Sequence, residues 1–198
     1  MVKTDIWKKR ALIGCAVGIG SPRIAELAGR LGFDAVWIEM EHASTDLVTA
    51  EQMCVATEAG GAIPIVRTAG YHREHILHAL EIGGRIIVAP LVNDAETARE
   101  VVKHGKFRPL GQRGFNSRSR GLEFGLDMPG MLRRANDETH LMPQIETVEA
   151  VNNLDKILDA AIAAGADLLI VASDYKALIE AWRGQLDRLH GTASNIVS

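Results

Sequence analysis

Short apolar segments recur along the chain, separated by stretches in which apolar and polar residues follow a helical period. The apolar segments are rich in valine and isoleucine and do not alternate with polar residues, which is typical of parallel strands covered on both faces. We therefore predict six strands, at residues 11–17, 35–40, 62–66, 85–92, 141–145 and 167–172.

The stretches between these segments carry the start and stop signals of helices. Ser21 followed by Pro22 is a typical helix start, because serine caps the first turn and proline lacks an N–H that would be unbonded there. Paired glycines at residues 60–61 and 83–84 end two helical patterns. We predict helices from residue 21 onward and at residues 46–59, 71–82, 94–103, 148–164 and 176–189.

Strand starts recur about every 25 residues, which is the period of a β-α unit and predicts a parallel α/β domain. The exception is residues 107–130, a stretch rich in glycine, arginine and proline that we predict to be an active-site loop. An eight-unit barrel takes about 250 residues. The length of 198 residues by itself fits a smaller doubly wound sheet better.

Composition limits the class of protein. The length fits one domain, and the 47% hydrophobic and 24% charged residues are ordinary for a globular chain. A net charge of −3 and 5% aromatic residues argue against nucleic-acid or membrane partners. No apolar run reaches the ~18 residues of a membrane span, and the run before Cys15 is too short for an export signal. Cys15 and Cys54 lie in apolar segments, as reduced thiols of a cytoplasmic protein would.

Charged residues interrupt the apolar pattern at the end of the second predicted strand. Glu39, Glu41 and His42 follow one another there within four positions. Active sites of parallel α/β folds are built at this end of the strands, and a carboxylate that orients a histidine makes a general base. Because burying charge is costly, we favour a functional cluster over a surface turn.

Two other strands carry polar residues toward the same edge. Arg67 shares a face with Ile63 and Ile65, and Gln144 and Glu146 share a face of the fifth strand. The arginine either binds an anionic ligand or forms an internal ion pair, and the pattern alone leaves both open. Glu146 is a suitable donor for a hard divalent ion, although it would also suit the cap of the next helix.

Two further clusters have less specific interpretations. Three histidines at helical spacing are interpreted as a solvated helix face rather than a metal site. Four arginines of residues 107–130 either gather an anionic substrate or serve loop solvation and subunit contacts. The histidines are His72, His75 and His78, and the arginines are Arg108, Arg113, Arg118 and Arg120.

Five motifs occur in a fixed order: residues 32–42 (GFDAVWIEMEH), 64–67 (PIVR), 89–93 (APLVN), 109–114 (PLGQRG) and 143–147 (PQIET). Their order and spacing resemble the HpcH/HpaI family of class II, metal-dependent pyruvate aldolases. The resemblance implies a TIM-type (β/α)₈ barrel, commonly a hexamer. It implies that a 4-hydroxy-2-oxo acid is cleaved to pyruvate and an aldehyde, or formed from them, through a metal-bound pyruvate enolate.

The resemblance also implies roles for individual residues. Glu146 is expected to bind a divalent metal, Mg²⁺ or Mn²⁺, with Co²⁺ or Zn²⁺ as alternatives, and Gln144 to bind substrate in the same site. Arg67 is expected to bind the keto oxygen and stabilise the enolate. His42 is expected to act as the base, oriented by Glu39.

The chain departs from the family pattern in two ways. The family usually has aspartate at the position of Glu39. The family also continues, after the segment matching residues 152–158, through two further β-α units, one of which supplies a second metal carboxylate. Here the chain passes almost directly into residues 160–167, which resemble the approach to the eighth strand. We therefore expect residues 1–198 to form a single, incomplete barrel domain lacking about two β-α units near residues 155–165, which a longer natural chain would contain.

Two other functions stay open on the sequence. The first is another metal-dependent 2-oxo acid lyase or decarboxylase on the same barrel. The second is a catalytically inactive barrel that serves as a binding or assembly subunit, for which the missing second carboxylate is the main argument.

Overall fold

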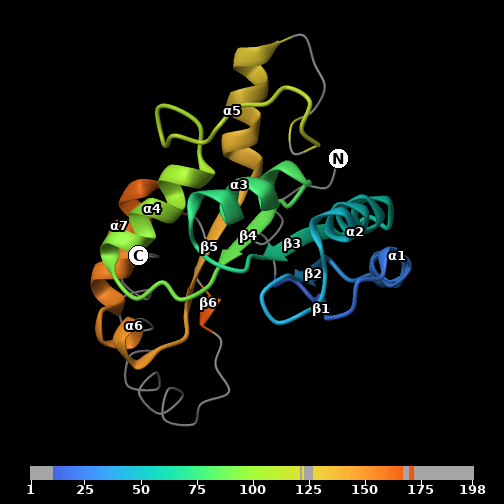
Figure 1. Cartoon of the computed structure of the whole chain (residues 1–198), viewed down its shortest axis with the longest axis horizontal. Helices are drawn as coiled ribbons and strands as arrows, with labels where there is room; N and C mark the ends of the chain where they lie inside the picture. The colour runs from blue at the N-terminus through green and yellow to red at the C-terminus, as the bar shows by residue number, and fades with distance from the viewer. Residues whose placement is uncertain (1–10, 121, 123–126, 167–169, 172–198) are drawn as a thin grey trace, which may run out of the picture.

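The computed structural model describes residues 11–120, 122, 127–166 and 170–171, and this part contains one sheet of six parallel strands (Figure 1). Each strand pairs with the next one in the sequence. Every strand lies within or beside a predicted apolar segment. The strands are β1 (Gly14–Val17), β2 (Ala35–Glu39), β3 (Ile63–Arg67), β4 (Ile86–Ala89), β5 (His140–Ile145) and β6 (Ile170–Val171).

Helices connect the strands, and most of the described helices begin at a capping side chain. Ser21, Asp46 and Asp94 each accept a hydrogen bond from a backbone N–H of the following first turn. The helix predicted at residues 148–164 is two helices, and the one predicted at 176–189 lies outside the described residues. In the described part, no helix is long and apolar enough to cross a membrane. The helices are α1 (Pro22–Arg30), α2 (Leu47–Ala59), α3 (Arg73–Glu81), α4 (Ala95–Gly105), α5 (Met128–Glu138), α6 (Val148–Asn152) and α7 (Leu154–Ala164).

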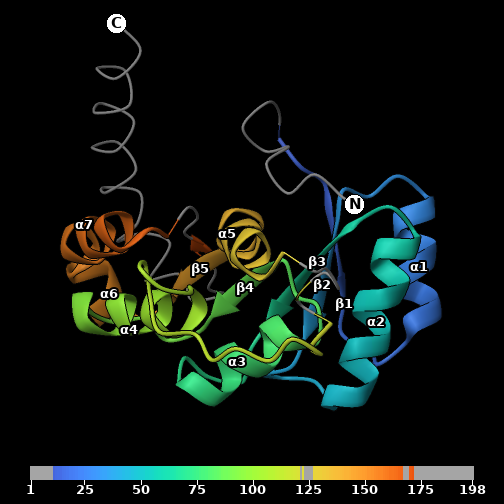
Figure 2. The same ribbon diagram turned by 90° about the horizontal axis from the view of Figure 1, so that it is seen from above.

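The strand order follows the sequence without reversal. In a doubly wound sheet the order reverses at a switch point and helices cover both faces. Here the helices that follow β1 to β4 pack along the outer side of the sheet (Figure 2). The fold is therefore of the TIM-barrel type, as predicted, and the doubly wound alternative is wrong.

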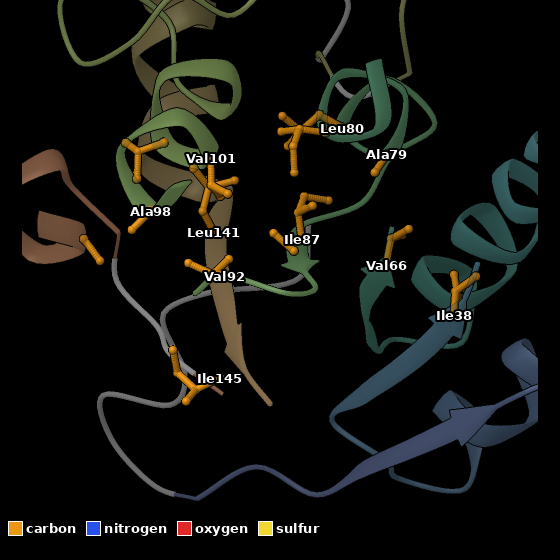
Figure 3. Close-up of a cluster of buried hydrophobic side chains, with 14 of the residues drawn as sticks. Ile38, Val66, Ala79, Leu80, Ile87, Val92, Ala98, Val101, Leu141 and Ile145 are labelled. Atoms are coloured by element: carbon orange, nitrogen blue, oxygen red, sulfur yellow. The ribbon is translucent and has the colours of Figure 1, made fainter. Parts of the chain in front are cut away.

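Successive residues of β2 to β5 face two different cores. The outward face carries Ile38, Val66 and Ile87, which pack against helix residues such as Leu80 and Val101 (Figure 3). The inward face forms a smaller cluster, made of Ala35, Ile63 and Ile86 with the partly buried Leu12, Ile65 and Met142. The period-two prediction for the third and fifth strands is thus confirmed, since Ile63, Ile65 and Met142 share this inward face.

Residues 107–130, of which the structure describes 107–120, 122 and 127–130, follow α4 in the chain. They leave α4, which ends at Gly105, and lead into α5 and then into β5. Lys106 Nζ donates to the backbone oxygen of Thr139 at 2.6 Å, just before β5 begins. The described part of this stretch does not support the prediction of an active-site loop, because a connection from a helix to a parallel strand returns to the amino ends of the strands. Sequence analysis also missed α5, although Asp127 Oδ1 accepts from the Gly130 N–H at 3.1 Å as a cap.

Candidate active site

Polar side chains from three strands meet at the carboxyl edge of the inward face. Glu39 ends β2, Arg67 ends β3, and the two are register partners. Gln144 lies near the end of β5, and Glu146 follows that strand at the next inward position. The charges of Arg67 and of Glu41 both act on the pKa of Glu146. The side chains at the ends of β2 and β3 therefore lie within electrostatic reach of Glu146.

Glu39 and Arg67 form a largely buried ion pair. Glu39 Oε2 accepts from Arg67 Nε at 2.7 Å and lies 2.7 Å from Nη2, and the side chains are 12% and 15% exposed. Trp37 contacts both, because its Nε1 donates to Glu39 Oε2 at 3.1 Å and its ring centroid lies 5.7 Å from the guanidinium carbon. Burial acts to raise the pKa of Glu39, but hydrogen bonds from Arg67, from Trp37 and from two backbone N–H groups outweigh it and hold this pKa below its ordinary value.

Glu41 and His42 extend this cluster toward solvent. Glu41 Oε2 lies 3.2 Å from Arg67 Nη1 and 3.6 Å from His42 Nε2. The His42 side chain is 72% exposed, whereas that of Glu41 is 14% exposed. Glu39 Oε1 accepts from the backbone N–H of Glu41 at 2.7 Å and of His42 at 3.1 Å. The carboxylate beside the histidine ring is therefore Glu41, while Glu39 contacts His42 through the backbone.

Glu146 is held by two donors at the end of β5. The Leu91 N–H donates to Oε1 at 2.7 Å, and Gln144 Nε2 donates to Oε2 at 2.8 Å. Burial raises the pKa of the Glu146 carboxyl group; the Leu91 N–H opposes this shift, and the negative charge of Glu41 adds to it. A carboxylate whose charge is disfavoured in this way would be stabilised by a bound cation.

The connection between β4 and α4 fixes the surroundings of Glu146. Leu91 has a φ of 56°, in the left-handed region that leucine rarely adopts. Asn93 Oδ1 accepts from Thr147 Oγ1 at 2.5 Å, and Thr147 Oγ1 in turn caps α6. Because Thr147 is the cap, the interpretation of Glu146 as a helix cap is wrong. Sequence analysis missed Leu91, since a left-handed backbone at an apolar residue leaves no hydropathy signal.

The donors around Glu146 suit a hard divalent cation. Gln144 is 1% exposed, and its Oε1 has no hydrogen-bond partner among the described residues. Amide and carboxylate oxygens are ligands that Mg²⁺ and Mn²⁺ prefer. In the part of the chain that the structure describes, no three or more His, Cys, Asp and Glu side chains are arranged to hold a metal. Gln144 and Glu146 thus fit such an ion and offer it a partial set of ligands.

The arginines of residues 107–130 do not join this cluster. Arg120 Nη2 donates to Glu58 Oε2 at 2.7 Å, below the amino end of the sheet. Arg113 is 6% exposed and so lies inside the molecule, whereas Arg108 and Arg118 are exposed. These positions favour a structural role for Arg113 and Arg120 over the gathering of substrate.

The chain is similar in sequence to a known protein family and to characterised proteins. The HpcH/HpaI aldolase/citrate lyase family matches residues 13–188. A 4-hydroxy-2-oxo-heptane-1,7-dioate aldolase from Escherichia coli is 34% identical over 150 residues, which are 76% of this chain and 57% of that protein. A 2-dehydro-3,6-dideoxy-6-sulfogluconate aldolase from Pseudomonas putida is 33% identical over 164 residues, 83% of this chain and 63% of that protein.

The fold is similar to that of a solved family member. The crystal structure of an HpcH/HpaI aldolase from Desulfitobacterium hafniense has a TM-score of 0.78 at 28% identity, covering 87% of this chain and 66% of that one. The chain spans 57% of the length of the Escherichia coli relative, so it matches part of that protein. On the family match, which runs through nearly all of the described strands and helices, this chain belongs to the HpcH/HpaI aldolase/citrate lyase family.

Proposed function

We propose that the protein is a carbon–carbon lyase, a class II aldolase that cleaves a 4-hydroxy-2-oxo acid into pyruvate and an aldehyde, or forms it from them. The observation that carries the proposal is the placement of Arg67. Glu39 holds its guanidinium at the carboxyl edge, within electrostatic reach of Glu146. Family membership supports the same reaction class, since both relatives described above are named as aldolases.

In the cleavage direction, the bond between C3 and C4 of the substrate breaks. The 4-hydroxyl group loses its proton and becomes the aldehyde carbonyl, while the bonding electrons pass to C3 and onto the C2 oxygen as an enolate. Protonation of C3 then gives pyruvate. Arg67 places positive charge where the C2 oxygen becomes negative, which is how such transition states are stabilised. The exposed His42 ring is available to take the hydroxyl proton, directly or through water.

A divalent ion completes the proposal. We propose that Glu146 holds Mg²⁺ or Mn²⁺, with Co²⁺ or Zn²⁺ as alternatives, and that Gln144 lines the same site. Such an ion, when bound, acts as a Lewis acid toward a 2-oxo acid. The buried Gln144 also supplies an amide oxygen that no described residue engages, so this side chain is the second candidate contact for substrate.

The proposed partners are pyruvate, an aldehyde and further copies of the chain, with a hexamer as the form that the family resemblance implies. The proposed compartment is the cytoplasm. Cys15 and Cys54 are both free thiols, and burial raises the pKa of Cys54 to about 12. An unreactive buried thiol of this kind suits a reducing environment.

Pyruvate release from a 4-hydroxy-2-oxo acid tests the proposed function. Release is followed as loss of NADH absorbance in a coupled lactate dehydrogenase assay. We expect activity that a divalent metal supports, that EDTA abolishes and that Arg67→Met removes. Loss of CO₂ from oxaloacetate without cleavage of the hydroxy acid would instead indicate a decarboxylase. Absence of both activities in the metal-loaded protein would indicate an inactive binding or assembly subunit.

A further inference from the structure

The Glu39 carboxylate is surrounded by donors on both oxygens. Oε1 accepts from the backbone N–H groups of Glu41 and His42, at 2.7 and 3.1 Å. Oε2 accepts from Trp37 Nε1 at 3.1 Å and contacts two nitrogens of Arg67, each at 2.7 Å. A carboxylate offers about four lone-pair sites, and all of those of Glu39 are used. Glu39 therefore has no site left to accept a hydrogen bond from the His42 ring.

These contacts fix the orientation of the Arg67 guanidinium. Nε and Nη2 both face one Glu39 oxygen, and the Trp37 ring lies 5.7 Å from the guanidinium carbon. Nη1 is left on the other edge, where Glu41 Oε2 lies at 3.2 Å but makes no hydrogen bond. Nη1 carries two N–H groups, so a ligand oxygen can engage this edge of Arg67 beside the Glu41 carboxylate.

We propose that Glu39 is the positioning residue of Arg67, which holds the guanidinium side-on so that its Nη1 edge faces the substrate position between Glu41 and Glu146. The carboxylate next to the His42 ring is then Glu41, and Glu39 acts on catalysis through the arginine. The catalytic part of this inference rests on the proposed function. The positioning part rests on contacts within the chain and is testable without activity.

The length of the Glu39 side chain is what permits this arrangement. Glu39 and Arg67 are register partners on adjacent parallel strands, which lie about 4.8 Å apart. At this separation the Glu39 carboxylate contacts the backbone of the turn after its own strand and also the guanidinium of Arg67 on the neighbouring strand. Aspartate is one methylene shorter. Glu39→Asp should therefore keep the charge but lose either the contacts with the turn or those with the Arg67 guanidinium.

Arginine-selective ¹⁵N labelling tests the positioning directly, because the Nε–H of a held guanidinium exchanges slowly with water. The Arg67 signal is assigned by its loss in Arg67→Lys. We expect Glu39→Gln to speed the exchange of this proton by about tenfold, the effect of losing a charge-assisted hydrogen bond. Glu39→Asp should have an intermediate effect and provides the readout if the glutamine variant does not fold.

Glu58→Gln is the matched control at the opposite edge of the sheet. Glu58 Oε1 accepts from Arg85 Nε at 3.0 Å, so this variant should release the Nε–H of Arg85 and leave that of Arg67 unchanged. If Glu39→Gln leaves the exchange of the Arg67 Nε–H unchanged, the positioning role is wrong.

Kinetics of the same variants measure the catalytic part. If the protein cleaves 4-hydroxy-2-oxo acids, Glu39→Gln should lower kcat by about 10²-fold, because a misplaced group loses its effect mainly in the transition state, and should change KM little. If Glu39→Gln speeds the exchange of the Arg67 Nε–H but leaves kcat unchanged, the proposed effect on catalysis is wrong. If Glu39→Gln speeds this exchange but the wild-type protein does not cleave 4-hydroxy-2-oxo acids, the positioning role is supported and the proposed function is contradicted.

Discussion

Two glutamate–arginine clusters lie at opposite edges of the same sheet, and they are built differently. At the amino edge, Glu58 accepts from Arg85 at 3.0 Å and from Arg120 at 2.7 Å, one arginine for each oxygen. At the carboxyl edge, both nitrogens of one side of Arg67 converge on a single oxygen of Glu39. The first arrangement joins three segments of the chain, whereas the second holds one cation in one orientation.

The two clusters also differ in what they leave unsatisfied. Glu58 uses both oxygens in ion pairs with its arginines. Around Arg67 and Glu146, the buried atoms without a hydrogen-bond partner among the described residues are acceptor oxygens, Glu41 Oε2 and Gln144 Oε1, whereas in the Glu58 cluster the atom without one is a donor nitrogen, Arg120 Nε. A buried polar atom without a hydrogen-bond partner lowers the stability of the folded state unless a ligand supplies the missing partner. Unpartnered acceptor oxygens suit a bound cation, so this difference favours the carboxyl edge as the place for metal-dependent chemistry.

The largest expected effect comes from removing Arg67, the arginine of the carboxyl edge. Arg67→Met should lower kcat/KM by about 10²–10³-fold, which is typical of losing a group that stabilises a developing oxyanion. Arg85→Met, the matched change at the amino edge, should leave kcat/KM of the folded protein unchanged. Steady-state kinetics of the two variants measure this, and equal losses would remove the distinction between the edges.

The pH dependence of stability separates the two glutamates. Because the pKa of Glu39 is lowered on folding, its contribution to stability is present above the unfolded carboxyl pKa and is lost as the pH falls through the folded value. Glu39→Gln should therefore cost about 3 kcal/mol at neutral pH, as for breaking a buried pair, and progressively less in acid. Urea unfolding across a pH series measures the difference. A cost that does not change with pH would contradict the ion pair.

The contribution of Glu146 to stability should change with pH in the opposite direction to that of Glu39. Its pKa is raised on folding, mainly by burial, so its contribution to stability is lost as the pH rises through the folded value. In metal-free protein, Glu146→Gln should be more stable than the wild type at neutral pH, by on the order of 1 kcal/mol. Added Mn²⁺ should stabilise the wild type more than the variant, because the ion binds the folded state. Equal Mn²⁺ effects in thermal unfolding would argue against Glu146 as a ligand.

The smallest effect is expected at Arg113, the buried cation of the amino edge. Its guanidinium carbon lies 4.6 Å from the Phe107 ring centroid, its nitrogens have no hydrogen-bond partner among the described residues, and burial lowers its pKa to about 10. Arg113→Met should raise the free energy of unfolding by about 0.5–1 kcal/mol, since the lost cation–π contact is smaller than the relieved cost of the buried charge. Chemical denaturation checks this, with activity unchanged. A clear destabilisation would show that Arg113 has a partner in solution.

The fold was predictable because its signals are local and repeated. Buried runs, the serine and aspartate caps and the paired glycines each mark an element, and Gly61 and Gly83 do adopt positive φ where two helices end. Length alone favoured the doubly wound sheet, since it carries no information about strand order. The motifs favoured the barrel, and the order of β1 to β6 agrees with them.

The site was predictable in its residues but not in its contacts. Glu39, Arg67, Gln144 and Glu146 were identified from period two and from the family resemblance, and the structure places all four at one edge. Which carboxylate faces the His42 ring depends on side-chain reach across strands, which sequence spacing does not encode. The left-handed backbone at Leu91 likewise results from the tertiary turn between β4 and α4.

Exchange of the methyl protons of pyruvate with D₂O tests the central claim most directly, because it needs enolate formation and no aldehyde. The protein is incubated with pyruvate and Mn²⁺, which is chelated before ¹H NMR spectra are recorded. The account predicts exchange above the buffer rate that EDTA abolishes and that Arg67→Met removes while Arg85→Met retains. No exchange in the metal-loaded wild type, or exchange that persists in Arg67→Met, would contradict it.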